Sequence, residues 1–482
     1  MKREFLLNIL LLVGINLLIK PIYIFGVDRV VQNAVGKEAF GLYFAVFNFT
    51  FLLQIINDFG IHTYNNKHIA QNRDLLKSYF PNVLMLKTML AGLYILVIFL
   101  TAFPSGYTAA KYLPFLGWLC LIHILNSLML YLRSNISALG WYRTDSWLSS
   151  LNKFLMILVC APLLWVDRFY EVFQIEWFIY AQVVTLVITA LVALWLTRNE
   201  ITWSSWKLDL SFLKRIAKDS YPYALAIFLM TVYTRVDAVM IERMLVDGAG
   251  EAGIYAGAYR LLDASNMIGF LFAGLLLPMF ARMLKEGEDY RELLQFSLQM
   301  ILAGAITLSL PVYFFKSEIM MLLYQEGTAY WGAVMGWLIL SFIAGCVIYV
   351  YSALLTAGEK LMRMNRIFVL GIILNVVLNY FLILSDKAAG AALATLLTQS
   401  FIAIALVVLA MREFNLRINL RMTSRAILFF LLTGMVCYLS TTYLPFDWRL
   451  KFVLSGLASL VGAVVLGLVS VKDVVSLLAE RE

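Results

Sequence analysis

The chain alternates long apolar segments with short polar ones. Fourteen of the apolar stretches are about 20 residues long, the length at which a helix crosses the roughly 30 Å hydrocarbon layer of a bilayer. They lie at approximately residues 5–29, 40–61, 80–103, 112–134, 146–166, 176–197, 220–246, 253–281, 293–315, 331–357, 364–384, 388–411, 425–444 and 451–471. The pattern predicts an all-α integral membrane protein with about 14 transmembrane helices. We expect the first to be a retained span, because no short apolar core ends there in a small-residue cleavage site.

The polar connections carry their basic residues asymmetrically. With the N-terminus in the cytoplasm, about 24 Lys and Arg fall in cytoplasmic segments and about 9 in outer ones, as the positive-inside rule requires. This asymmetry predicts a multi-pass membrane protein with both termini in the cytoplasm. The longest connection, residues 198–219, is basic and amphipathic, which is typical of a helix that lies along the membrane surface.

Similar motifs in the two halves indicate an internal duplication. The segment DRVVQNAVGKEAFGLY (28–43) resembles DAVMIERMLVDGAGEAGIY (237–255), and SALGWYR (137–143) resembles LTAGEKLMR (355–363). Parallel repeats of this kind are one of the two repeat plans of secondary transporters. The predicted parts are an N-terminal six-helix lobe (1–200), a linker (201–219), a pseudo-symmetric C-terminal six-helix lobe (220–411) and two further helices (412–482). The alternative is chance similarity between apolar sequences.

Composition supports the membrane class and excludes several functions. Hydrophobic residues make up 62% of the 482 residues and charged residues 14%, and the mean hydropathy is +0.83. In a membrane protein the net charge of +8 indicates basic cytoplasmic loops rather than nucleic-acid binding. The four cysteines lie singly in apolar runs, which leaves no disulfide framework or zinc-ligand spacing. No loop is long enough to bury a soluble catalytic core, so we do not expect an enzyme.

Charged residues inside the apolar segments are the main functional signal. Arg, Lys or Asp at the centre of a spanning helix costs about 2.5–3.5 kcal/mol, so such residues usually face a bundle interior or a wet cavity. Five basic residues fall within predicted spans: Lys20, Lys87, Lys153, Arg235 and Arg260. We expect them to bind an anionic substrate. For Lys87 and Lys153, about two turns from the cytoplasmic end, snorkelling to the interface is the alternative.

Helical spacing separates the acidic partners of these residues into two cases. Arg235 and Asp237 are two residues apart, roughly 200° around a helix, so they point to nearly opposite sides. Arg260 and Asp263 are three apart and share a face, which predicts a local ion pair.

A second set of polar residues has the chemistry of a cation site. Asp237, Asn379 and Thr395 lie at similar depths, on the order of 5–8 Å from their span centres toward the outside. With Asn375 and the backbone carbonyl of Ala391 they offer hard oxygen ligands that suit an alkali cation. The alternative is that Asn375 and Asn379 form interhelical hydrogen bonds, with Asp237 protonated or paired elsewhere.

In motif order the whole chain resembles the multidrug/oligosaccharidyl-lipid/polysaccharide (MOP) flippase superfamily, particularly the O-antigen-type polysaccharide flippases and the related lipid II flippases. The residues that carry the resemblance are GKEAFGLYFAVFNF (36–49), INDFG (56–60), GIYAGAYRLLD (253–263), LTAGE (355–359) and GAALATLLTQ (390–399). The resemblance implies two lobes that rock about a cationic central cavity. It also implies a sodium site at positions that match Asp237, Asn375, Asn379, Ala391 and Thr395, although Asn379 replaces an acid of the family pattern. Spans 13 and 14 resemble the pair that forms a lipid-tail groove in the lipid II flippases.

The resemblance implies a location in the bacterial cytoplasmic (inner) membrane. The implied cargo is a lipid-linked oligosaccharide diphosphate, moved from the cytoplasmic to the periplasmic leaflet by alternating access. The coupling ion is left open between Na⁺ and H⁺, and no other cofactor is expected. The expected partners are membrane lipids and polysaccharide polymerase machinery, with the chain itself a monomer. The alternatives are a cation-coupled multidrug exporter, an integral-membrane glycosyltransferase or polymerase, and a non-transporting scaffold. A net-positive set of intramembrane charges disfavours cationic drugs as cargo.

Overall fold

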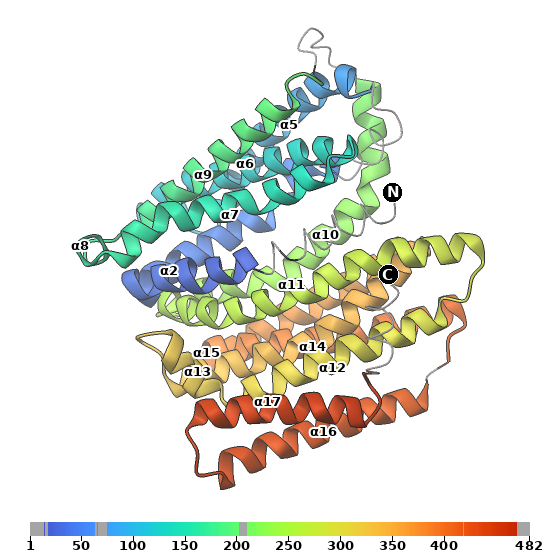
Figure 1. Ribbon diagram of the computed structural model, residues 1–482. Helices are drawn as coiled ribbons and strands as arrows, with labels where there is room; N and C mark the ends of the chain where they lie inside the picture. Colours follow the sequence, from blue (N-terminus) through green and yellow to red (C-terminus); the bar gives the residue numbers. More distant parts are fainter. Residues whose placement is uncertain are drawn as a thin grey trace. The chain divides into compact units, whose positions relative to one another are not determined.

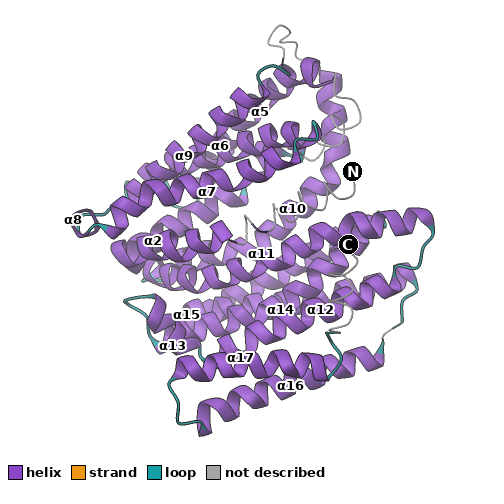
Figure 2. Ribbon diagram, in the orientation of Figure 1, coloured by secondary structure: helices purple, strands orange, loops and turns teal. Residues whose placement is uncertain are grey.

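The computed structural model describes residues 14, 18–62, 65, 75–201, 210–417 and 419–469. All regular secondary structure in these residues is helical, which confirms the all-α membrane class (Figure 2). The chain divides into two compact units, Met1–Gly253 and Ile254–Glu482. Residues 202–209 of the predicted linker lie outside the described residues, so the division into six-helix lobes stays a prediction.

The first unit is a bundle of long helices with short connections (Figure 1). Its helices are η1 (Ile24–Asp28, a π-helix), α2 (Arg29–Leu52), α3 (Ile55–Asp58), α5 (Leu75–Ala102), α6 (Leu113–Ala138), α7 (Tyr142–Trp165), α8 (Asp167–Tyr170), α9 (Ile175–Thr197) and α10 (Leu210–Met244). It also contains the start of α11 (Gly248–Glu286).

The second unit contains the rest of α11 and all later helices. These are α12 (Arg291–Phe314), α13 (Lys316–Leu323), α14 (Ala329–Ala357), α15 (Leu361–Phe414), α16 (Leu420–Tyr443) and α17 (Trp448–Val465). Helix α15 has non-helical backbone angles at Asp386 and Lys387, so its 54 residues contain two spans. The break falls between the segments predicted at 364–384 and 388–411.

Eleven helices of the described residues are long and apolar enough to cross a membrane, fewer than the 14 segments in the sequence. One reason is that α15 holds two of the segments. Nearly half of the first segment, residues 5–13 and 15–17 of 5–29, lies outside the described residues. The second, 40–61, is divided between α2, which is kinked at Gly36, and the short α3. The remaining ten segments correspond to ten of the eleven helices.

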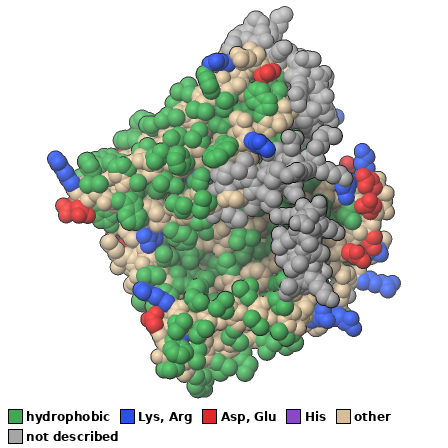
Figure 3. All heavy atoms as spheres, in the orientation of Figure 1, with side chains coloured by type: hydrophobic (Ala, Val, Ile, Leu, Met, Phe, Trp, Pro, Cys, Tyr) green, Lys and Arg blue, Asp and Glu red, His purple; other side chains and the backbone are tan. Residues whose placement is uncertain are grey.

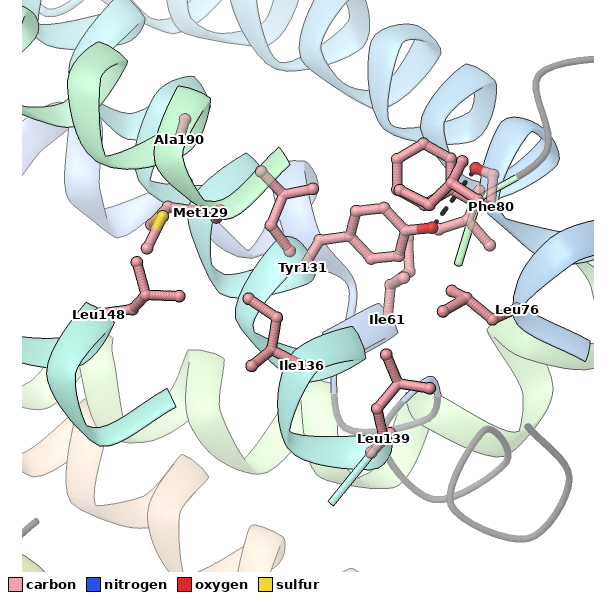
Figure 4. Close-up of a cluster of buried hydrophobic side chains, with 14 residues drawn as sticks. Ile61, Leu76, Phe80, Met129, Tyr131, Ile136, Leu139, Leu148 and Ala190 are labelled. Carbon is pink, nitrogen blue, oxygen red and sulfur yellow. Dashed lines mark hydrogen bonds between the residues drawn. The ribbon is translucent and has the colours of Figure 1, made fainter. Parts of the chain in front are cut away.

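Buried and exposed apolar side chains have different roles in this fold. A buried cluster in the first unit joins α5, α6, α7 and α9, with Phe80 and Tyr131 at its centre; the Tyr131 hydroxyl donates to the Phe80 carbonyl at 3.4 Å (Figure 4). Many large apolar residues are instead exposed, and hydrophobic side chains dominate the visible surface (Figure 3). Apolar side chains on the surface suit a protein surrounded by lipid tails. The backbone polar groups of the helices also tolerate lipid, because each helix satisfies its own backbone hydrogen bonds.

Helix α2 and the start of α11 approach so closely that glycine is required on both. A Cβ at Gly41 would lie 1.8 Å from the carbonyl oxygen of Ala249, and one at Gly253 would lie 2.0 Å from that of Lys37. The Gln32 side chain also donates to the Gly253 carbonyl at 2.8 Å. Each glycine thus faces the carbonyl oxygen of the residue that lies four positions before the other glycine. This reciprocal contact joins the two motifs of the predicted duplication.

Candidate functional site

The basic residues predicted to bind substrate occupy different environments in the first unit. Lys20 is half-buried. Lys153 on α7 is half-buried and lies over the Tyr23 ring, 4.0 Å from its centroid. Arg235 on α10 is half-buried and lies 5.7 Å from the centroid of the Phe51 ring. An aromatic face attracts a cation, and more strongly where the cation is desolvated, so these contacts stabilise the charges of Lys153 and Arg235 within the bundle.

Lys87 on α5 is occupied by ligands from the protein. Its ammonium group lies 2.9 Å from the Asp58 carboxylate and donates to the Ser127 hydroxyl at 2.7 Å and to the Asn57 carbonyl at 3.3 Å. His62 contacts the other carboxylate oxygen of Asp58. Lys87 is 6% exposed, so it does not extend to the interface as snorkelling requires. This network ties the last residues of α3 to α5, and the Asp58 carboxylate balances the charge of Lys87.

Arg260 and Asp263 on α11 form the predicted local ion pair. The guanidinium and carboxylate are 3.9 Å apart, and both side chains are about one-fifth exposed (20% and 24%). The prediction from their i, i+3 spacing is confirmed. The long separation leaves the pair weaker than the contact between Lys87 and Asp58.

Four of the five predicted cation ligands lie on the two segments of α15, Asn375 and Asn379 before the break and Ala391 and Thr395 after it. Asn379 Nδ2 donates to Asn375 Oδ1 at 3.0 Å, Asn375 Nδ2 donates to the Thr398 hydroxyl at 3.5 Å, and the Thr395 hydroxyl donates to the Ala391 carbonyl at 3.1 Å. All are buried. Gly390 permits this close approach, because a Cβ there would lie 1.8 Å from the Leu382 carbonyl oxygen. The fifth residue, Asp237 on α10, is completely buried but belongs to the first unit.

The donor chemistry of the two α15 segments fits an alkali cation. Amide, hydroxyl and backbone oxygens are hard ligands, and four residues supply them from two antiparallel segments. Sequence reasoning missed Tyr255, whose hydroxyl lies 3.2 Å from the Thr395 Oγ1. Its place in the motif GIYAGAY was the only signal that marked it. Among the described residues there is no group of three or more His, Cys, Asp or Glu that could hold a metal ion.

A second buried charged cluster was also missed. Glu242 near the end of α10 accepts hydrogen bonds from Tyr107 at 3.0 Å and Tyr112 at 2.5 Å, and Arg243 donates to the same carboxylate at 2.5 and 2.8 Å. Arg243 also donates to the Ser105 carbonyl at 2.8 Å. Burial and the Glu242 carboxylate raise the pKa of Tyr107, so its phenol stays protonated and donates. The cluster fastens the connection between α5 and α6 to α10.

Several solved structures share this fold over most of the chain. The lipid II flippase MurJ in an inward closed conformation has a TM-score of 0.67 and 14% identity, over 94% of this chain and 97% of MurJ. A mutant of the Vibrio cholerae MATE transporter VcmN has a TM-score of 0.58 and 14% identity, over 84% and 95% of the two chains. A MOP superfamily transporter from Pyrococcus furiosus has a TM-score of 0.57 and 14% identity, over 85% and 94%. At this identity the likeness shows the fold.

Sequence comparison identifies the family. No curated protein matches the chain. The family model described as polysaccharide biosynthesis protein matches residues 5–284, which is more than half of the 482 residues. Together with the MurJ and MATE fold, this match supports a flippase or transporter of the MOP type and bears out the resemblance seen in the motifs. The chain belongs to the family described as polysaccharide biosynthesis protein.

Proposed function

We propose that this protein is a flippase that moves a polyprenyl-diphosphate-linked oligosaccharide from the cytoplasmic to the periplasmic leaflet. The observation that carries the proposal is the match of residues 5–284 to the polysaccharide biosynthesis family. Polysaccharide biosynthesis requires glycan precursors, and a flippase moves lipids between leaflets. A lipid-linked glycan precursor is therefore the substrate that fits both the family and the fold. The likeness to the lipid II flippase MurJ supports a lipid-linked cargo.

The basic residues inside the spans are assigned to the diphosphate. Lys20, Lys153 and Arg235 in the first unit and Arg260 in the second carry positive charge where water is scarce, and phosphate oxygens match that charge. Lys87 was predicted with them, but Asp58 balances its charge, so we give it a structural role in positioning α3 and α5.

The direction of transport follows from the charge of the cargo. A membrane potential that is negative inside favours outward movement of an anion by about 2.3 kcal/mol per charge per 100 mV. A diphosphate with about two negative charges would gain roughly twice that amount. A coupling cation, Na⁺ or H⁺, bound by Asp237 or by the oxygens of Asn375, Asn379, Ala391 and Thr395, would add to the driving force on its return.

A cation-coupled multidrug exporter is the second candidate, because MATE transporters share the fold. The MurJ comparison covers 94% of this chain and the VcmN comparison covers 84%, so MurJ accounts for more of its helices. The net-positive charge of the intramembrane residues also disfavours cationic drugs. We therefore rank the glycan flippase first.

Replacement of Arg235 or Arg260 by alanine tests the proposed function in cells. Export of the surface glycan should be lost while the protein remains in the membrane at its normal level. Arg449→Ala is a matched control, since Arg449 is an exposed arginine in the first turn of α17 and lies beside the Trp448 ring. Normal glycan export in the Arg235 and Arg260 variants, or drug resistance that depends on the wild-type protein, would overturn the proposal.

A further inference from the structure

A cavity of about 680 Å³ lies within the second unit, among α12, α14, α15 and α16. Its walls are largely apolar and include Leu298 and Leu302 of α12 and Val407 of α15. Its charged lining comes from the start of α12 and from the connection between α15 and α16, which lie at the same end of this unit (Figure 1). The cavity is thus apolar along the helices and polar at one mouth.

The mouth of the cavity is positively charged. Arg291, the first residue of α12, and Arg417, in the connection before α16, both line it, and the lining contains no Asp or Glu. Both arginines are exposed, and among the described residues neither guanidinium forms an ion pair. The neighbouring acid Glu413 is already paired with Lys360 at 3.2 Å and with Arg363. The mouth therefore has two cationic groups and no acidic group in its lining to balance them.

Hydrogen bonds fix the shape of this mouth. Asn419 Oδ1 accepts from the backbone N–H of Met422 at 3.1 Å and caps α16, while its Nδ2 donates to Gln295 Oε1 on α12 at 3.2 Å. The Tyr290 hydroxyl donates to the Phe414 carbonyl at 3.4 Å. Because these bonds join the start of α12 to both sides of the connection, the arginines stand on a defined rim.

We propose that this cavity binds one anionic phospholipid of the cytoplasmic leaflet, with its phosphate between Arg291 and Arg417 and an acyl chain along Leu298 and Leu302. The charge of the loops places this mouth on the cytoplasmic side, at the level of lipid headgroups. A free phosphate would leave the apolar walls unfilled, and a neutral lipid would leave the two arginines unmatched. The site lies in the second unit alone.

Lipid binding to the purified full-length chain tests the proposal. Native mass spectrometry in detergent would measure retention of phosphatidylglycerol and of phosphatidylcholine, and inorganic phosphate would be added as a competitor. Each arginine near an anionic headgroup strengthens binding about fivefold, so the double variant Arg291→Gln/Arg417→Gln should bind phosphatidylglycerol about 30-fold more weakly. Leu302→Trp, which fills the cavity, should lose the same lipid. Arg282→Gln, an exposed arginine of α11 outside the cavity, is the matched control and should bind as wild type does.

The outcomes separate this site from the proposed transport function. Equal retention of phosphatidylglycerol by wild type and the double variant would overturn the proposal, as would equal retention of phosphatidylcholine. Competition by millimolar inorganic phosphate would assign the mouth to a free anion and contradict the lipid. All these measurements are made without glycan carrier, so they stand or fall separately from the flippase proposal.

Discussion

Alanine at Gly253 should separate α2 from the start of α11. The new Cβ would lie 2.0 Å from the Lys37 carbonyl oxygen, about 1 Å closer than the 3.0 Å limit that real Cβ atoms keep. The obstacle is backbone, so no side-chain rotation relieves the overlap, and the two helices must move apart. That movement also strains the 2.8 Å hydrogen bond from Gln32 to the Gly253 carbonyl.

The expected magnitude follows from two opposing terms. Alanine in a helix interior is favoured over glycine by about 1 kcal/mol. Overpacking typically costs about 1–3 kcal/mol and more where backbone must move, and a lost hydrogen bond adds about 1 kcal/mol. We therefore expect Gly253→Ala to lower the free energy of unfolding by about 3 kcal/mol, which for a chain of 482 residues corresponds to a fall in Tm of about 3 °C.

Thermal unfolding of the purified protein in one detergent measures this effect. Gly41→Ala should behave alike, because its Cβ would lie 1.8 Å from the Ala249 carbonyl oxygen. Gly92→Ala on α5 is the control, since nothing lies within 4 Å of the added Cβ, and its Tm should stay level or rise. A wild-type Tm in both Gly253→Ala and Gly41→Ala would refute the close crossing.

Three further predictions concern the charged clusters and the cation site. Lys87→Met should lower the free energy of unfolding by about 3–5 kcal/mol because it leaves the Asp58 carboxylate buried without its ammonium partner, and adding Asp58→Asn should restore part of the Tm. Glu242→Gln should lower Tm more than Tyr107→Phe, since the first change disturbs bonds from Tyr107, Tyr112 and Arg243 and the second removes one hydrogen bond worth about 1 kcal/mol; equal losses would contradict the cluster. Sodium at about 100 times its Kd should stabilise wild type by about 2.7 kcal/mol but leave Asp237→Ala unchanged in Tm, and equal shifts in both would remove Asp237 from the cation site.

Local patterns in the sequence predicted the features that depend on near neighbours. Apolar length gave most of the spans, and the break before residue 388 appears in α15 at Asp386 and Lys387. The i, i+3 spacing of Arg260 and Asp263 was enough to predict their ion pair. These features depend on helix geometry, which is the same in any context.

The clusters that sequence reasoning missed join residues far apart in the chain. Asp58 contacts Lys87 from a different helix, and Glu242 contacts Tyr107, which lies 135 positions earlier in the chain. No spacing rule connects such positions, because the contact depends on how helices pack. The same limit explains why the sequence did not predict the pair of Lys87 with Asp58, since nothing in the motif INDFG indicates that its aspartate contacts a lysine of the next long helix.

Leaflet exchange of the cargo in vesicles tests the central claim most directly. The purified protein would be reconstituted into liposomes that carry a fluorescent polyprenyl-diphosphate oligosaccharide, and a membrane-impermeant reagent would report the fraction of label in the outer leaflet. We predict that vesicles with the wild-type protein transfer labelled lipid from the inner to the outer leaflet, where the reagent reaches it, and that vesicles with Arg235→Ala do not. Exposure in wild-type vesicles no greater than in protein-free vesicles, with the protein folded and correctly inserted, would contradict the account.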